Sequence, residues 1–127
     1  LPESVMVITD YMYDMASAMA SSDMVICRSG AITLAELTAR GIPSILIPHP
    51  YVPDNVQEKN ARALEAKGAA RVIVNDEFTP ERLAHEVNCI LEDDKLMVRM
   101  SKAAYSLGVR DSLSRVSDAI ALALKKR

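Results

Sequence analysis

The chain has 127 residues and a formal net charge of −2. This length suits a single domain that buries roughly two thirds of its unfolded surface and needs no metal or disulfide to fold. Half of the residues are hydrophobic but only 4% are aromatic, which predicts an aliphatic core between helices and a sheet. Without a basic surface to neutralise phosphates, no nucleic-acid partner is expected.

The two cysteines, Cys27 and Cys89, lie far apart and show no Cys/Cys or Cys/His spacing of a metal site. No metal and no cofactor are therefore expected, and reduced thiols suit the cytoplasm. No apolar run approaches the ~20 residues of a membrane span, so the protein is expected to be soluble or at most peripheral. Because the chain begins at Leu1 rather than Met, we expect a piece of a longer protein.

Strands and helices are predicted to alternate from residue 1 to residue 76. The expected strands are the apolar runs 5–8, 24–27, 44–47 and 71–74. The expected helices are 14–21, 31–40 and 55–67, with Asp14 as a cap and with Gly41 and Gly68 ending the last two. This alternation predicts an α/β fold with a parallel sheet.

Residues 77–127 are predicted to form a helical cap on the same compact domain. Thr79 and Pro80 supply an N-cap and a first helical residue. Three apolar stripes at helical spacing follow, and all three are interpreted as core. The last of them consists of Leu113, Val116, Ile120 and Leu124.

The junction between the second predicted strand and its helix can hold a phosphate. Its sequence is Cys27-Arg28-Ser29-Gly30-Ala31-Ile32-Thr33-Leu34-Ala35-Glu36. The first N–H groups of a helix lack partners, and a turn of small residues lets an anion approach them. One turn later, Glu36 can accept hydrogen bonds from a ribose diol, which suggests a nucleotide site. The alternatives are that Ser29 is only an N-cap and that Glu36 only pairs with Arg40.

Further ligand groups are expected where the loops after the strands meet, at the carboxyl edge of the sheet. On the helix 55–67, Val56, Ala63 and Leu64 are predicted to be the apolar side, with Asn60 buried among them and Gln57 at the edge. Both amides could bind sugar hydroxyls. Alternatively, Gln57 closes a capping box with Asp54, and Asn60 bonds the backbone of the loop 48–53. Glu58, Arg62 and Glu65 are predicted to face water.

No catalytic group is predicted in this chain. His49 follows the third expected strand but has no orienting carboxylate in the sequence, and His85 is assigned no role. Neither a Ser nucleophile turn nor a metal-binding His pair nor a phosphate-loop Lys is present in the sequence.

The sequence from Ile8 to Ala70 resembles the C-terminal half of the MurG family of bacterial N-acetylglucosaminyltransferases, which convert lipid I to lipid II in peptidoglycan synthesis. The segments that carry the resemblance are 23–31, 33–37, 41–48 and 57–61, and the segment 111–116 extends it over nearly the whole chain. The resemblance implies a Rossmann-like domain, the C-terminal half of a glycosyltransferase-B fold, with UDP-N-acetylglucosamine as the donor. The intact enzyme would be peripheral on the cytoplasmic face of the inner membrane.

The resemblance implies roles for individual residues along the donor. Met12 would lie against uracil through its backbone, and Tyr11 would shape that pocket. Ala31, Ile32 and Thr33 would offer donors to the β-phosphate and the sugar.

By the same resemblance, Glu36 would accept from the ribose diol and Arg28 would support the phosphate loop. Gln57 and Asn60 would bind the hydroxyls of N-acetylglucosamine. Val56 departs from the pattern, because many members have a polar residue there.

By the same resemblance, the glycine-rich turn that follows the first strand of the family's C-terminal domain, and the whole N-terminal domain, are expected to lie outside this chain. The acceptor lipid I would bind through that N-terminal domain, so these residues are expected to bind donor weakly and not to catalyse. The alternatives are another UDP-sugar transferase, such as a glycolipid synthase or a split two-chain enzyme, and a non-catalytic nucleotide-sugar binding module. A structural fragment that dimerises through its exposed sheet edge is the third.

Overall fold

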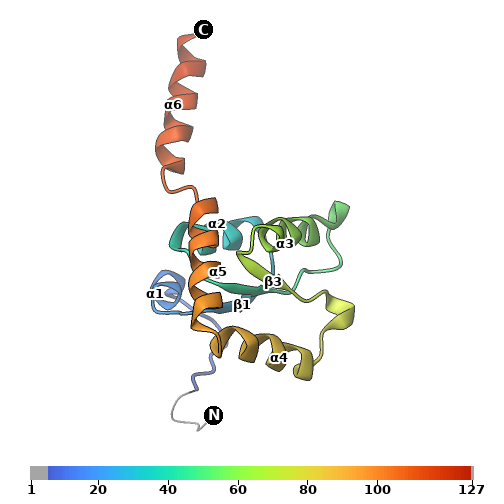
Figure 1. The fold of residues 1–127 in the computed structure, drawn as a ribbon. Helices are drawn as coiled ribbons and strands as arrows, with labels where there is room; N and C mark the ends of the chain where they lie inside the picture. The colour runs from blue at the N-terminus through green and yellow to red at the C-terminus, as the bar shows by residue number, and fades with distance from the viewer. Residues whose placement is uncertain (1–5, 127) are drawn as a thin grey trace.

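The computed structural model describes residues 6–126. Figure 1 shows a small sheet with helices on both faces and a last helix that leads away from the body. In chain order the elements are α1 (Met15–Ala20), β1 (Val25–Cys27), α2 (Ala31–Arg40), β2 (Ser44–Leu46), the 3-10 turn η2 (Pro53–Asn55), α3 (Val56–Ala66), β3 (Ala70–Val72), the 3-10 turn η3 (Asn75–Glu77), α4 (Pro80–Leu91), α5 (Asp94–Leu107) and α6 (Ser112–Lys125).

The sheet is parallel and its strands follow sequence order, β1-β2-β3. In register, Ile26 faces Ile45, and Ile45 faces Arg71. The predicted α/β alternation is confirmed, since α2 and α3 form the two crossovers between neighbouring strands. The carboxyl ends of all three strands therefore lie at one edge of the sheet, where ligands of such folds bind.

Alternate residues of the strands face two separate cores. Leu46 packs with Leu37 of α2 and Ala61 of α3, and all three are fully buried. On the other face Ile45 packs with Ile90 of α4 and Met100 of α5. Figure 1 accordingly shows α2 and α3 on one side of the sheet and α4 on the other. Covering both faces explains why β2 is buried at every position.

Helix α5 crosses α2 (Figure 1) and contacts its carboxyl end. Gly41 ends α2 in the left-handed conformation, with φ 71°, as the sequence predicts. The Ser101 hydroxyl of α5 donates a hydrogen bond of 2.7 Å to the Gly41 carbonyl. A Cβ at Gly41 would lie only 3.0 Å from Cβ of Tyr105, so the glycine also permits the two helices to approach closely.

The predicted first strand is wrong for the residues that the structure describes. Val5 lies outside them, while Met6, Val7 and Ile8 are extended chain with 50%, 91% and 82% exposure. An apolar run becomes a strand only when a neighbour completes its hydrogen bonds, and no strand pairs with this segment within residues 6–126. The sheet described there has three strands rather than the four expected.

The third apolar stripe is not core in this structure. Leu113, Val116, Ile120 and Leu124 are between 56% and 81% exposed, because α6 stands clear of the body (Figure 1). Periodicity predicted the helix correctly but could not say what covers it. In the part of the chain that the structure describes, no helix has the length and apolar character of a membrane span.

Candidate functional site

Arg28 joins the carboxyl ends of all three strands. It follows β1, and its Nη1 donates to the Ile47 carbonyl at 3.1 Å and to the Pro48 carbonyl at 3.1 Å, both after β2. The same nitrogen donates to Oδ1 of Asn75, after β3, at 3.2 Å. One planar guanidinium therefore sets the spacing of the three loops that border the site.

Ser29 and Gln57 connect that loop to α3. Ser29 is fully buried, and its hydroxyl donates to the Gln57 carbonyl at 2.7 Å. The side-chain oxygen of Gln57 accepts the His49 N–H at 2.9 Å. Ser29 is thus not an N-cap, and Gln57 does not form a capping box with Asp54, because both side chains hold neighbouring loops instead.

The amino end of α2 is open. Its first helical hydrogen bond runs from Leu34 N–H to the Gly30 carbonyl at 3.0 Å, so the N–H groups of Ala31, Ile32 and Thr33 precede the ladder. The N-cap is Gly30, which has no side chain to occupy them. The first turn also contains no acidic residue. Three N–H groups and the positive end of the helix dipole therefore face outward together.

Gly30 is not required by the protein itself. Its φ of −66° and ψ of 146° are open to any residue, and a Cβ built on it meets nothing within 4 Å. Within residues 6–126 nothing fills the position that a side chain at Gly30 would take, which leaves room there for a ligand to approach the backbone.

The side chains of Glu36 and Asn60 form no hydrogen bond or ion pair within the described residues. Glu36 is exposed on α2, and in the described chain it forms no ion pair with Arg40. Asn60 is half-buried rather than buried, and none of the hydrogen bonds found among residues 6–126 uses its amide. The alternative in which Asn60 bonds the loop 48–53 is therefore not supported.

Tyr11 and Met12 lie on the segment before α1, with 64% and 44% exposure. The Tyr11 ring contacts the Tyr13 ring edge-on, with centroids 4.8 Å apart, and the Thr9 hydroxyl donates to the Tyr11 carbonyl at 2.9 Å. All of these contacts are within the segment itself. The structure thus brings Arg28, Ser29 and Gln57 together by direct bonds, but it does not tie Tyr11 or Met12 to them.

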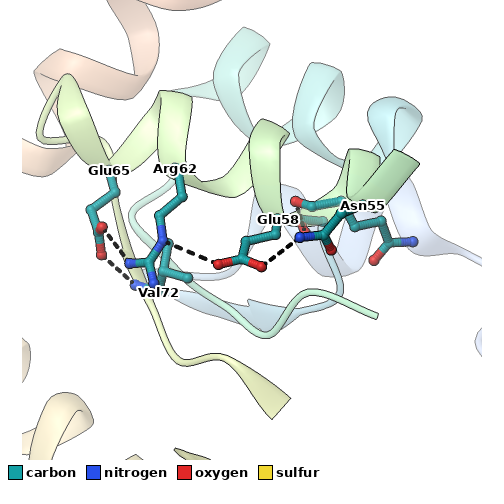
Figure 2. A network of polar contacts seen from close by, with 7 residues as sticks. Asn55, Glu58, Arg62, Glu65 and Val72 are labelled. Atoms are coloured by element: carbon teal, nitrogen blue, oxygen red, sulfur yellow. Dashed lines mark hydrogen bonds and ion pairs between the residues drawn. The ribbon is translucent and has the colours of Figure 1, made fainter. Parts of the chain in front are cut away.

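A polar network holds α3 against β3 (Figure 2). Asn55 Nδ2 donates to Glu58 at 2.7 Å, and Arg62 bridges Glu58 at 3.7 Å and Glu65 at 2.7 Å. The other oxygen of Glu65 accepts the Val72 N–H at 3.1 Å. The hydrogen bond from Arg62 to Glu65 raises the pKa of the Arg62 guanidinium.

This network begins at strained backbone. Asp54 and Asn55 are both left-handed, with φ of 55° and 52°, and they are the only such non-glycine residues among those described. Two consecutive residues in this region cost of order 1–3 kcal/mol each. The side-chain bonds of Asn55 and Gln57 hold the chain in this geometry just where α3 begins.

The rotation of α3 differs from the prediction. Val56 is 45% exposed and Ala63 is exposed, whereas Ala61 is fully buried and Leu64 is half-buried. Glu65 was expected to face water, but it reaches β3. The polar bonds of Gln57 and Glu65 turn the helix, and a pattern of apolar residues alone does not contain that information.

A cavity of about 230 Å³ lies at the carboxyl ends of β1 and β2. It is lined by Ile26, Cys27, Arg28, Ile47, Asn75 and Phe78. Burial raises the pKa of the Cys27 thiol to about 11, so this thiol stays protonated and unreactive at neutral pH.

The sequence did not predict two groups that bond to the site residues, the Asn75 side chain, which binds Arg28, and the His49 N–H, which binds Gln57. Asn75 directly follows the expected strand 71–74 but was given no role, and the His49 N–H was given none either. The available signal was that both residues lie in loops that follow strands, and that the Arg in the first loop is long enough to reach Asn75.

The family model of the glycosyltransferase family 28 C-terminal domain matches residues 2–120. The chain belongs to this family. The match covers the sheet, the open amino end of α2 and most of α6. It also confirms the Rossmann-like fold class and the resemblance on which the site assignments were based.

Curated relatives of this family 28 domain are named UDP-N-acetylglucosamine–N-acetylmuramyl-(pentapeptide) pyrophosphoryl-undecaprenol N-acetylglucosamine transferases. One from Acetivibrio thermocellus is 47% identical over 120 residues, which is 94% of this chain and 32% of the relative. Another from Bacillus cytotoxicus is 41% identical over 125 residues, which is 98% of this chain and 34% of the relative. The chain therefore spans about a third of the length of these relatives.

A solved structure shares the family 28 fold. The crystal structure of Acinetobacter baumannii MurG superimposes with a TM-score of 0.77 at 31% sequence identity. The superposition covers 87% of this chain and 33% of that one.

Proposed function

We propose that this domain binds UDP-N-acetylglucosamine as the donor part of an inverting N-acetylglucosaminyltransferase that converts lipid I to lipid II. The observation that carries the proposal is the open amino end of α2, with three N–H groups ahead of the helix ladder and Glu36 one turn later. The names of the curated relatives point to the same donor and acceptor chemistry.

In this proposal the donor lies across the carboxyl edge of the sheet. The N–H groups of Ala31, Ile32 and Thr33 receive the diphosphate, and Gly30 leaves space for it. Glu36 accepts both hydroxyls of the ribose, because a carboxylate offers two oxygens to a diol. Arg28 and Ser29 hold the loop on which the donor lies.

The remaining contacts come from α3 and from the segment before α1. Among the described residues no hydrogen bond engages the Asn60 amide, which suits sugar hydroxyls. His49 engages only the side-chain oxygen of Gln57, so its NH₂ group can donate to the sugar as well. Tyr11 and Met12 would receive the uracil, and their exposure leaves them free to do so.

The chemistry assigned to the intact enzyme is a displacement at the anomeric carbon. The 4-hydroxyl of the muramyl residue forms a bond to that carbon as the bond to the diphosphate oxygen breaks, which inverts the configuration and releases UDP. The hydroxyl proton passes to a base outside this chain. Negative charge gathers on the leaving diphosphate, and the N–H groups at the end of α2 stabilise it more in the transition state than in the ground state.

The test is an amide-shift NMR titration of the 127-residue chain with UDP, UDP-N-acetylglucosamine and UDP-glucose. We expect Kd values of about 0.1 mM to several mM, because part of the proposed site lies outside the chain. Glu36→Ala removes a charged hydrogen-bond partner and should weaken UDP binding about 10- to 100-fold.

Glu81→Ala is the matched control, because Glu81 is an exposed carboxylate on α4, away from α2. It should leave the titration unchanged. Shifts with UDP but no preference for the N-acetylglucosamine donor would favour another UDP-sugar transferase or a nucleotide-sugar binding module. The absence of shifts at residues 31–36 would refute the nucleotide site.

The acceptor is assigned to an N-terminal domain outside this chain, and the intact enzyme is expected at the cytoplasmic face of the inner membrane. Within the described residues β1 pairs only with β2, so we also expect two copies to dimerise through its other edge. Light scattering tests this, and Ile26→Lys, at a position 43% exposed on β1, should give a monomer.

A further inference from the structure

A cavity of about 640 Å³ lies at the amino edge of the sheet, where α2 ends and α5 crosses it. Its wall includes Asp23, which precedes β1, and the turn 41–43, which precedes β2. The groups that Arg28 joins lie at the opposite, carboxyl edge. None of the residues assigned to the donor lines this cavity, so the proposed donor does not account for its side chains.

The guanidinium of Arg110 is held in a fixed position in the wall of this cavity. Its Cζ lies 3.8 Å from the centre of the Tyr105 ring, and its Nη1 donates to the carbonyls of Tyr105 at 3.0 Å and Ala39 at 3.4 Å. A Cβ at Gly108 would lie 2.7 Å from this Nη1, so the glycine leaves room for the guanidinium. A guanidinium that is already stacked and hydrogen-bonded loses little conformational freedom when an anion binds to it.

The positive charges in the wall have no carboxylate partners within residues 6–126. Arg110 bonds only to neutral carbonyls, and Arg40, the second guanidinium of the wall, forms no ion pair there. The Arg110 guanidinium contacts Ala39, the residue directly before Arg40, and both arginines line the same cavity. Only Nη1 of Arg110 is engaged, so its Nη2 and Nε can still donate to a ligand.

Two features of the wall would repel an anion. They are the carbonyl end of α2, which is the negative end of its helix dipole, and the carboxylate of Asp23. The carbonyls are already engaged, since Ala39 accepts from Arg110 and Gly41 accepts from the Ser101 hydroxyl at 2.7 Å. Two guanidinium groups then outweigh one carboxylate, and they disfavour a cation as the ligand.

We propose that this cavity binds a phosphate monoester with an apolar substituent. A phosphate offers three acceptor oxygens and can bridge Arg40 and Arg110, whereas a carboxylate is matched by a single guanidinium fork. The larger apolar side chains of the wall are Met19, Ile42, Pro43, Met97 and Val98. A free phosphate ion would leave them in contact with water, so the ligand that fits carries an apolar group beside its phosphate.

This site is independent of the proposed donor site. Helix α2 has 10 residues, with Ala31 at the donor end and Arg40 at the cavity. The two ends of such a helix are about 15 Å apart. Failure of the test below therefore says nothing about UDP binding, and the reverse also holds.

The test is an amide-shift NMR titration of the 127-residue chain with phenyl phosphate, and with inorganic phosphate and phenol as its two halves. We expect shifts at residues 39–43 and 98–110 with a Kd of about 0.1–1 mM for phenyl phosphate, and about tenfold weaker binding of either half. Because a phosphate can also reach the amino end of α2, shifts at residues 31–36 report on the donor site and are evaluated separately.

Four variants separate the contributions of charge from those of folding. Arg40→Gln and Arg110→Gln should each weaken the binding of phenyl phosphate about tenfold, and Arg40→Gln breaks no hydrogen bond found among the described residues. Asp23→Asn removes the repelling carboxylate and should tighten binding. Arg99→Gln is the matched control, because Arg99 is an exposed cation on α5 outside the cavity, and it should leave the Kd unchanged.

A fifth variant tests the apolar part of the ligand. Val98 is 51% exposed, so Val98→Ser should leave the fold intact and weaken the binding of phenyl phosphate but not that of inorganic phosphate. Equal Kd values for phenyl phosphate and inorganic phosphate would indicate an adventitious ion only and would overturn the proposal. So would shifts confined to residues 31–36, or an Arg99→Gln variant that loses as much affinity as Arg40→Gln.

Discussion

Replacing Gly30 by serine should separate the stability of the protein from its ability to bind an anion. Gly30 is the N-cap of α2, its backbone angles are accessible to serine, and a Cβ there meets open space. A serine hydroxyl at this position accepts the N–H of Ile32 or Thr33. The substitution therefore supplies internally the hydrogen bond that the structure leaves for a ligand.

The magnitudes follow from these two effects. The new cap contributes a few tenths of a kcal/mol over glycine, and the lower entropy of the unfolded chain adds about 0.4–1 kcal/mol. Gly30→Ser should therefore raise the free energy of unfolding by about 0.5–1.5 kcal/mol. Loss of one hydrogen bond to a charged phosphate costs about 1.5–3 kcal/mol, so UDP binding should weaken about 10- to 100-fold.

Urea unfolding and the UDP titration measure the two quantities on one sample. Gly68→Ser is the matched control, because its Cβ also meets nothing within 4 Å, but its φ is +76°. We expect this variant to lose about 1–2 kcal/mol of stability and to keep its affinity for UDP. If Gly30→Ser destabilises the chain, or stabilises it with unchanged UDP affinity, the reasoning about the open helix end is wrong.

Three further predictions concern the support of the site. Gly41→Ala should lower the free energy of unfolding, measured by urea denaturation, by about 2–4 kcal/mol, because a left-handed alanine is strained and its Cβ crowds Tyr105. A loss below about 1 kcal/mol would contradict the close approach of α2 and α5. Ser29→Ala should cost about 1–2 kcal/mol, measured in the same way, and weaken UDP binding because α3 loses its hydrogen bond to the loop before α2. Unchanged affinity would show that this bond does not position α3. Burial raises the pKa of the Cys27 thiol to about 11, so at pH 8 its thiolate fraction should be about 100-fold below that of a thiol of ordinary pKa 9.0, and iodoacetamide should label Cys27 far more slowly in the folded chain than in urea. The contribution of this thiol to stability is intact below pH 9 and is lost as the pH rises through 11; equal labelling rates of Cys27 in the folded and unfolded chain would refute this.

The sequence predicted well those elements whose ends are chemically marked. Helix α2 has the bounds that were expected, because Gly41 can end it and the small residues at 29–31 can begin it. The N-caps Asp14 and Thr79 also accept the expected bonds, from Ser17 N–H and Arg82 N–H. Local steric and hydrogen-bonding rules are sufficient at such positions.

The sequence predicted poorly whatever depends on long-range partners. The rotation of α3 is set by Gln57 and Glu65, which bond to His49 and Val72 from other segments. The hydrogen bonds of Arg28 join it to residues that lie 19 to 47 positions later in the chain. Such bonds leave no periodic trace in the sequence, so the site could be located from the strand ends but its internal contacts could not be predicted.

Helix α6 has a consequence for how the chain exchanges its amide protons. It has 14 residues, a length at which an isolated helix in water is close to balance with the unfolded coil. Because every residue from 112 to 125 is exposed, only local bonds hold it, whereas α5 is anchored by Met100 and Ala104. Deuterium should therefore enter α6 long before α5, and burial of its apolar stripe would appear first as a slowing of that exchange.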